Sequence, residues 1–169
     1  PVLMKEGVNN DPSLVDSIEV SLHKSSYPYQ ALETVTVPLF IDGSEPCTFT
    51  SPADYYFIAI RHRNAVETWS ALPVDIGNVT QYDFSSLAEN SYADNAIEVE
   101  PSVFALYSGD LNQDGNIDLL DLSQLESDIN SFNSGYSASD INGDGNDDLL
   151  DSPILESNIY NFISTIQPN

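Results

Sequence analysis

The chain has 169 residues, of which 27 are acidic and four are lysine or arginine, so its formal net charge is −23 at pH 7. This charge repels nucleic acid and anionic membrane surfaces, and we expect neither as a partner. Hydrophobic residues make up 41% of the chain, which is enough to bury a core, so the acidity does not indicate disorder.

Residues 1–105 contain short segments of alternating polarity, separated by Pro, Gly, Asn and Asp. Within residues 17–23, for example, Ile18, Val20 and Leu22 share one face, and the polar residues between them share the other. The candidate strands are residues 17–23, 34–41, 48–50, 55–63, 71–76, 81–84 and 96–99. This number and spacing predict a mainly β chain, with an antiparallel β-sandwich of immunoglobulin-, fibronectin- or transthyretin-like type over residues 1–105.

Two acidic segments with the same pattern follow. Residues 110–121 read DLNQDGNIDLLD, and residues 140–151 read DINGDGNDDLLD. An EF-hand-type loop supplies side-chain oxygens at positions 1, 3, 5, 9 and 12, a backbone carbonyl at position 7 and a glycine at position 6. The two copies place these ligands at Asp110, Asn112, Asp114, Asn116, Asp118 and Asp121, and at Asp140, Asn142, Asp144, Asn146, Asp148 and Asp151.

The ion that this set of ligands favours is calcium. All the ligands are hard oxygens, and magnesium prefers to retain its waters. Two carboxylates about 5 Å apart repel by about 3 kcal/mol at an effective dielectric constant of ~20, so the carboxylates of each loop require a cation. An Asn- and Asp-rich surface turn would explain one copy, but two copies in register favour two calcium ions.

An apolar stripe with helical spacing follows each loop. The stripe residues are Leu122, Leu125, Ile129 and Phe132 in the first copy, and Leu155, Ile159, Phe162 and Ile166 in the second. Neither loop has an evident entering helix, because Gly135 and several serines precede the second loop and a short segment from Phe104 precedes the first. Each unit is therefore half an EF-hand, and the two units form a small α-helical region over residues 106–169.

Duplicated loop-helix units with Asp at position 12 resemble type I dockerin domains, here over residues 107–166. The resemblance implies that the two units pack antiparallel about a pseudo-twofold axis and that each loop binds calcium through the residues named above. It also implies that the helix surfaces engage a cohesin on another protein. Many dockerins carry small polar residues after position 9, whereas this chain has the pairs Leu119-Leu120 and Leu149-Leu150.

The second copy departs from the family pattern at two further positions. Asp147 occupies position 8, which is usually apolar, and Pro153 replaces Ser123 of the first copy. Proline is tolerated only in the first turn of a helix, so we expect the second helix to begin close to Pro153.

The segment YYFIAIRHRNAVETWS at residues 55–70, running on to YSGDLNQDG, is similar to a domain pair in the carboxy-terminal parts of secreted bacterial proteins. That similarity implies attachment or assembly rather than chemistry. It also implies an extracellular or cell-surface location, where millimolar calcium fills even weak loops.

Catalysis has little support in the sequence. His23 and His62 are the only histidines, and Cys47 is the only cysteine, so an intramolecular disulfide is excluded. His62 keeps the parity of Ile60, which indicates a packed histidine at a strand end. We therefore expect no enzyme.

Three functions remain open. The favoured one is a non-catalytic assembly protein, whose repeat is ordered by two calcium ions and binds a cohesin-like partner. The second is a self-polymerising filament subunit, joined through edge strands or a swapped segment at residues 2–5. The third is a carbohydrate-binding module with an aromatic platform that includes Trp69, Tyr27 and Tyr55. We also expect calcium chelation to unfold residues 107–166 and to leave the β region folded.

Overall fold

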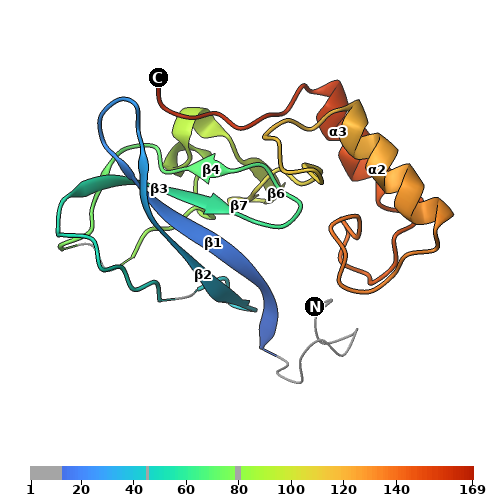
Figure 1. Cartoon of the computed structure of the whole chain (residues 1–169), viewed down its shortest axis with the longest axis horizontal. Helices are drawn as coiled ribbons and strands as arrows, with labels where there is room; N and C mark the ends of the chain where they lie inside the picture. The colour runs from blue at the N-terminus through green and yellow to red at the C-terminus, as the bar shows by residue number, and fades with distance from the viewer. Residues whose placement is uncertain (1–12, 45, 79–80) are drawn as a thin grey trace.

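The computed structural model describes residues 13–44, 46–78 and 81–169, and the segment 2–5 considered for strand exchange lies outside them. Up to residue 105 the described chain is mostly β-structure, and two helices follow, as the sequence predicts. Figure 1 shows the sheet on one side of the molecule and the helix pair on the other, with the C-terminal segment running back toward the sheet.

The main sheet is antiparallel, with strand order β2-β1-β3-β4, and β5 also pairs with β3. Its strands are β1 (Leu14–Lys24), β2 (Ala31–Phe40), β3 (Tyr55–Arg61), β4 (Thr68–Trp69) and β5 (Val74–Asp75). A separate two-stranded sheet pairs β6 (Ile97–Glu100) with β7 (Val103–Ala105), and two short 3-10 helices, η1 (Ala88–Asn90) and η2 (Tyr92–Asp94), precede it.

Two predicted strands are wrong. Residues 48–50 and 81–84 have no strand structure. Backbone N–H groups of Thr50 and Ser51 donate to the Glu33 carboxylate of β2 at 2.8 Å each, so this segment is attached through a side chain and not through a backbone ladder. Near the second segment, the Tyr82 hydroxyl donates to the Asn90 carbonyl at 2.5 Å, which ties that segment to η1. Strands β4 and β7 are too short for an alternation of polar and apolar residues to predict them from the sequence.

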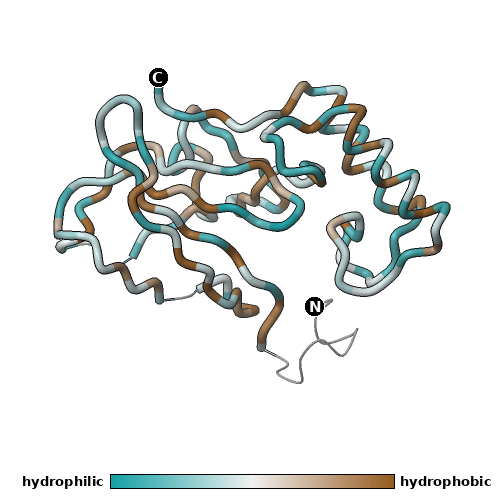
Figure 2. Tube along the Cα trace, viewed as in Figure 1, coloured by the Kyte–Doolittle hydropathy of each residue, from teal (hydrophilic) through white to brown (hydrophobic). Residues whose placement is uncertain are grey.

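Strand β1 is buried on both faces near its end. Val20 and Leu22 are buried as predicted, but Ser21 and His23 on the other face are buried too. The His23 ring lies 4.0 Å from the Trp69 ring, between ring centroids, and Ser21 Oγ is 2.9 Å from His23 Nε2. Two polar side chains therefore satisfy each other beneath an aromatic layer. Figure 2 shows apolar and polar residues interspersed along the strands.

The two helices are α2 (Leu119–Asn130) and α3 (Ser152–Tyr160). They lie side by side and run in opposite directions (Figure 1). Pro153 occupies the first turn of α3, as predicted. In the described chain, no helix is long and apolar enough to span a membrane.

The predicted apolar stripes end earlier than the sequence suggests. Leu125 and Leu155 are fully buried at the centre of the helix pair. Phe132 and Phe162 lie beyond the helix ends with φ of 55° and 54°, and their exposed fractions are 91% and 90%. A residue with positive φ ends each helix, so the helical spacing of apolar residues no longer places Phe132 or Phe162 on the buried face.

Candidate functional site

The loop carboxylates at position 1 hold the turn of their own loop. Asp110 accepts hydrogen bonds from the backbone N–H groups of Asp114 and Gly115, both at 3.1 Å. Asp140 of the second loop accepts the equivalent bonds at 2.9 and 3.0 Å. Gly115 has a φ of 90°, which a residue with a Cβ adopts only at a cost, so glycine is required at position 6.

The carboxylates at position 12 close each loop onto its start. Asp121 accepts from the backbone N–H groups of Leu111 and Asn112 at 2.8 and 3.1 Å, and from Asp118 at 2.8 Å. Asp151 accepts the equivalent three bonds at 2.8, 2.9 and 3.0 Å. The first and last acidic residues of each loop are therefore brought together by the fold.

The intermediate positions repeat as well. Asn112 Oδ1 accepts from the Asp114 backbone N–H at 2.8 Å, and Asp114 Oδ1 accepts from the Asn116 backbone N–H at 2.9 Å. Asn142 and Asp144 make the same two bonds at the same distances. This chain of side-chain turns is the local conformation that short Asx side chains favour.

The acidic residues at position 9 begin the exiting helix. Asp118 accepts from the Leu120 backbone N–H at 2.7 Å and forms a capping box with Asp121 at the start of α2. Asp148 accepts from the Leu150 backbone N–H at 2.7 Å, but α3 begins later, at Ser152. The sequence repeat thus produces the same hydrogen-bond network twice.

Burial and charge show whether a cation fits these loops. Asp110, Asp121, Asp140 and Asp151 are all fully buried. Among the described residues, no basic side chain forms an ion pair with any of them. Burial raises the pKa of Asp110 to about 6; backbone hydrogen bonds from Gly115 and Asp114 oppose this rise, and the negative charges of Asp121 and Asp114 add to it. A bound cation would offset the cost of burying these carboxylates and the repulsion between them, so the donor set fits calcium.

The carboxylates are not gathered as a preformed cluster. Within the described residues, no three side chains of the His, Cys, Asp or Glu type are placed to hold a metal ion together. Their oxygens accept backbone hydrogen bonds of their own loops instead. Amide and backbone oxygens would therefore have to complete the ligand set, as the EF-hand pattern requires.

Each loop is also held by the segment that leaves the other unit. The Ile117 N–H of the first loop donates to the Ile163 carbonyl at 3.0 Å, and Thr165 N–H donates to the Gly115 carbonyl at 2.7 Å. In the second loop, the N–H of Asp147 donates to the Asn133 carbonyl at 3.3 Å. The pairing is reciprocal, so the two units form one structure.

Two pairs of exposed leucines lie where the loops meet the helices, one pair in each unit. They are Leu119, Leu120, Leu149 and Leu150, and each is 63% to 74% exposed. The repeat thus exposes large apolar side chains at equivalent positions of its two units.

The aromatic residues predicted to form a sugar-binding platform do not lie together on the surface. Trp69 is 2% exposed, donates its Nε1–H to Glu67 at 2.7 Å and packs against Phe57, so it offers no face to a sugar. Tyr27 and Tyr55 are exposed, at 83% and 56%, but without Trp69 the expected platform is not formed.

No motif in the sequence points to Asn64, which is 3% exposed and contacts the repeat. It lies in the RHRN segment, where a run of polar residues immediately after a strand was the available signal.

Two loop-helix units with EF-hand-type loops, related by an internal repeat and packed antiparallel, define a pair of half EF-hands. The family model of the dockerin type I domain matches residues 108–160, which supports a dockerin domain in this part of the chain. Dockerin type I domains bind calcium, are non-catalytic, and associate with cohesin partners in extracellular and cell-surface bacterial proteins. No curated protein and no solved structure matches the chain significantly.

Proposed function

We propose that this protein is a non-catalytic assembly protein of the extracellular space or cell surface, whose repeat binds two calcium ions and associates with another protein. The observation that carries this proposal is the duplicated loop network, with two fully buried carboxylates in each copy. We further propose a division into a β-sandwich domain, residues 1–105, of immunoglobulin-, fibronectin- or transthyretin-like type, and a repeat, residues 106–169. Burial of β1 on both faces supports the sandwich.

The residues that would hold the ions are those at the ligand positions of the two loops. They are Asp110, Asn112, Asp114, Asn116, Asp118 and Asp121, and Asp140, Asn142, Asp144, Asn146, Asp148 and Asp151. Calcium at a concentration 100-fold above its dissociation constant adds about 2.7 kcal/mol of stability per site, provided that it binds only the folded chain. Calcium binding therefore contributes a large part of the stability of a region this small.

The residues proposed to contact the partner are the two pairs of exposed leucines, one pair in each unit. Their side chains replace small polar residues at the partner-binding positions of many dockerins, so the matching surface of the partner is apolar. Because the leucines follow position 9 of each loop directly, calcium fixes the backbone that presents them. The partner is a cohesin-like protein with an apolar groove, and it binds the leucines only when calcium orders the loops.

Calorimetry tests the calcium sites. The chelator-stripped full chain is titrated with calcium, and we expect two ions to bind. The double variant Asp110→Ala, Asp140→Ala is expected to lose binding. The control is Glu126→Ala, Glu156→Ala, which makes the same change of charge at equivalent exposed helix positions outside the loops. Unchanged binding in the first variant, or equal loss in the control, would make the loops incidental.

Light scattering tests the partner. We expect the calcium-loaded chain to remain a monomer and to bind an isolated type I cohesin, and we expect Leu119→Ser with Leu149→Ser to weaken that binding without changing calcium affinity. A rise in particle mass for the protein alone, lost in the leucine variant, would instead establish the filament function. Equal cohesin binding by both proteins would exclude the leucines as the contact.

A further inference from the structure

We propose that residues 61–67 of the β region are a structural part of the repeat: they position both calcium loops and make calcium binding stabilise the sheet as well. This inference rests on the proposed function, because it takes the loops to be calcium sites. It concerns the last residue of β3 and the segment between β3 and β4, all of which lie outside the residues that match the dockerin family model.

The contact with the second loop is made by a buried amide. Asn64 Nδ2 donates to the backbone carbonyl of Asp140 at 3.3 Å and to that of Ala138 at 3.2 Å. Asp140 is position 1 of its loop, so this side chain fixes the backbone from which the first carboxylate projects. Asn64 is 3% exposed, and removing its amide leaves two buried carbonyl groups without this donor.

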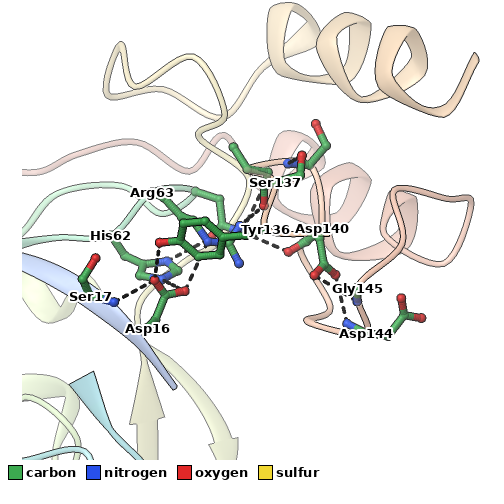
Figure 3. A network of polar contacts seen from close by, with 12 residues as sticks. Asp16, Ser17, His62, Arg63, Tyr136, Ser137, Asp140, Asp144 and Gly145 are labelled. Carbon is green, nitrogen blue, oxygen red and sulfur yellow. Dashed lines mark hydrogen bonds and ion pairs between the residues drawn. The ribbon is translucent and has the colours of Figure 1, made fainter. Parts of the chain in front are cut away.

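The neighbouring residue strengthens the same contact. Arg63 donates through Nη1 to the Ser137 carbonyl, and its guanidinium lies 4.8 Å from the centroid of the Tyr136 ring. Figure 3 shows Arg63, Tyr136 and Ser137 together, with the turn of the second loop at Asp140 and Gly145 close by. The approach to the second loop is therefore held from the end of β3.

The same segment also reaches the first loop. The Gly109 N–H, directly before Asp110, donates to the Asn64 carbonyl at 2.6 Å. Arg61 Nη2 donates to the carbonyl of Gln113, which is position 4 of the first loop, at 2.8 Å. The Val66 N–H donates to the Tyr107 carbonyl at 3.0 Å. A single segment of seven residues thus contacts both loops.

The segment contributes to the core of the repeat as well. Val66 is fully buried and belongs to the same apolar cluster as Leu111, Ile117, Leu125 and Leu155. Unfolding of the repeat would expose Val66 to water and break the hydrogen bonds that the Asn64 side-chain amide and backbone carbonyl make with the repeat. The segment joins β3 to β4, so the loss of these contacts destabilises the main sheet as well. The contacts therefore favour joint unfolding over the separate unfolding that the sequence suggested.

Trp69 reports directly on this coupling. It is the only tryptophan of the chain and is buried among Phe57 and Ala59 of the β region. The C-terminal residues 167–169 line the pocket beside it, so its fluorescence reports on the sheet and on this segment, and not on the helices. Thermal unfolding of the full chain is followed by Trp69 fluorescence and by helical circular dichroism, with chelator and with saturating calcium. We expect calcium at 100 times its dissociation constant to raise the Trp69 midpoint by on the order of 10 °C, together with the helical signal.

The positioning role is tested with Asn64→Ala. We expect calcium affinity to fall by on the order of 10- to 100-fold, as for other residues that orient metal ligands. The matched control is Asn90→Ala, because Asn90 donates its amide to the Asp83 carbonyl within the β region at 2.8 Å. The control is expected to keep the wild-type affinity, and equal affinity in the two variants would overturn the positioning role.

The wild-type measurement needs no variant, so it decides the coupling even where Asn64→Ala does not fold. If calcium raises the thermal midpoint of the helical signal but leaves that of Trp69 fluorescence unchanged, the coupling is overturned and the proposed function remains intact. An absence of calcium binding in calorimetry of the wild-type chain would instead overturn the proposed function, and this inference with it.

Discussion

Nε2 of His62 lies 2.8 Å from Oδ2 of Asp16, a carboxylate that is 6% exposed near the start of β1. The same carboxylate accepts a hydrogen bond from the Tyr136 hydroxyl at 2.6 Å and one from Arg63 Nε at 3.2 Å (Figure 3). Tyr136 lies between the two loops, so Asp16 connects the sheet to the repeat. Burial alone would raise the pKa of Asp16, but the hydrogen bonds from His62 and Tyr136 and the charge of His62 together lower it below its ordinary value of 3.8.

This lowered pKa predicts how stability responds to acid. Because the folded pKa lies below the unfolded one, Asp16 stabilises the folded chain fully above about pH 4, and the contribution is lost as the pH falls through the folded value. Asp16→Asn is expected to cost about 3 kcal/mol at pH 7 and to remove this part of the acid sensitivity. Urea unfolding followed by Trp69 fluorescence, between neutral pH and pH 2, measures both.

The control for this measurement is Asp54→Asn. Asp54 is an exposed carboxylate that accepts a hydrogen bond from the adjacent Tyr55 N–H. The stability of the control should fall with acid as steeply as that of the wild type. A pH dependence for Asp16→Asn as steep as that of the wild type would show that Asp16 does not stabilise the connection.

Asp147 is predicted to lower stability. It is 4% exposed, its Oδ1 has no hydrogen-bond partner among the described residues, and Oδ2 accepts from Ser137 Oγ at 2.8 Å. Burial raises its pKa, as do the charges of Asp128, Asp140 and Asp151, against the hydrogen bond from Ser137. Asp147→Asn keeps an acceptor for Ser137 and removes the charge, so we expect a gain on the order of 1 kcal/mol in chelator.

Chemical denaturation in chelator measures this gain. Asp128→Asn is the comparison, because both oxygens of Asp128 accept hydrogen bonds, from Asn133 Nδ2 at 2.8 Å and from Ser139 Oγ at 2.6 Å. That variant should gain nothing. A loss of stability in Asp147→Asn would show that the buried charge has a stabilising partner in the folded chain.

Gly109 is expected to tolerate no side chain. Its φ is 126°, and an added Cβ would lie 2.8 Å from Leu155 Cδ1 and 3.0 Å from Ile117 Cγ2 in the core of the repeat. Gly109→Ala is therefore predicted to cost more than Gly43→Ala, because Gly43 has a φ of 73° but nothing within 4 Å of its added Cβ. The Gly43 variant should lose about 1 kcal/mol from backbone strain alone. Equal thermal midpoints for the two variants would contradict the packing.

The loops were predictable because their information is local. Each ligand position and the glycine at position 6 form a fixed pattern within twelve residues, and the structure repeats the same hydrogen bonds in both copies. The helix cores at Leu125 and Leu155 follow from period alone. The sequence could also indicate β-structure, because the alternation of Val20 and Leu22 is a local pattern.

The rest depends on contacts distant in sequence. Nothing in the RHRN segment indicates that Asn64 contacts Asp140, because the two are 76 positions apart. The alternation of β1 likewise predicts an exposed His23, whereas Trp69 covers it. The exposure of Phe132 depends on where α2 ends, and a helical period does not report helix ends.

The reciprocal pairing of the units makes a final prediction about the C-terminal segment. Thr165 N–H donates to the Gly115 carbonyl of the first loop at 2.7 Å, and residues of the same segment reach the sheet, where Asn95 Nδ2 donates to the Ser164 carbonyl at 3.1 Å. Truncation after Ile163 removes both contacts. We expect it to weaken calcium binding to the first loop about 10-fold.

The second loop provides the internal comparison for this truncation, because Gly135 N–H donates to the Gly145 carbonyl there at 3.0 Å and that contact is unchanged. Calorimetry should therefore resolve one weakened site and one unchanged site. Combining the truncation with Asp140→Ala, which removes the second site, assigns the weakened one. Equal weakening of both sites would mean that the C-terminal segment stabilises the whole repeat and not the first loop in particular.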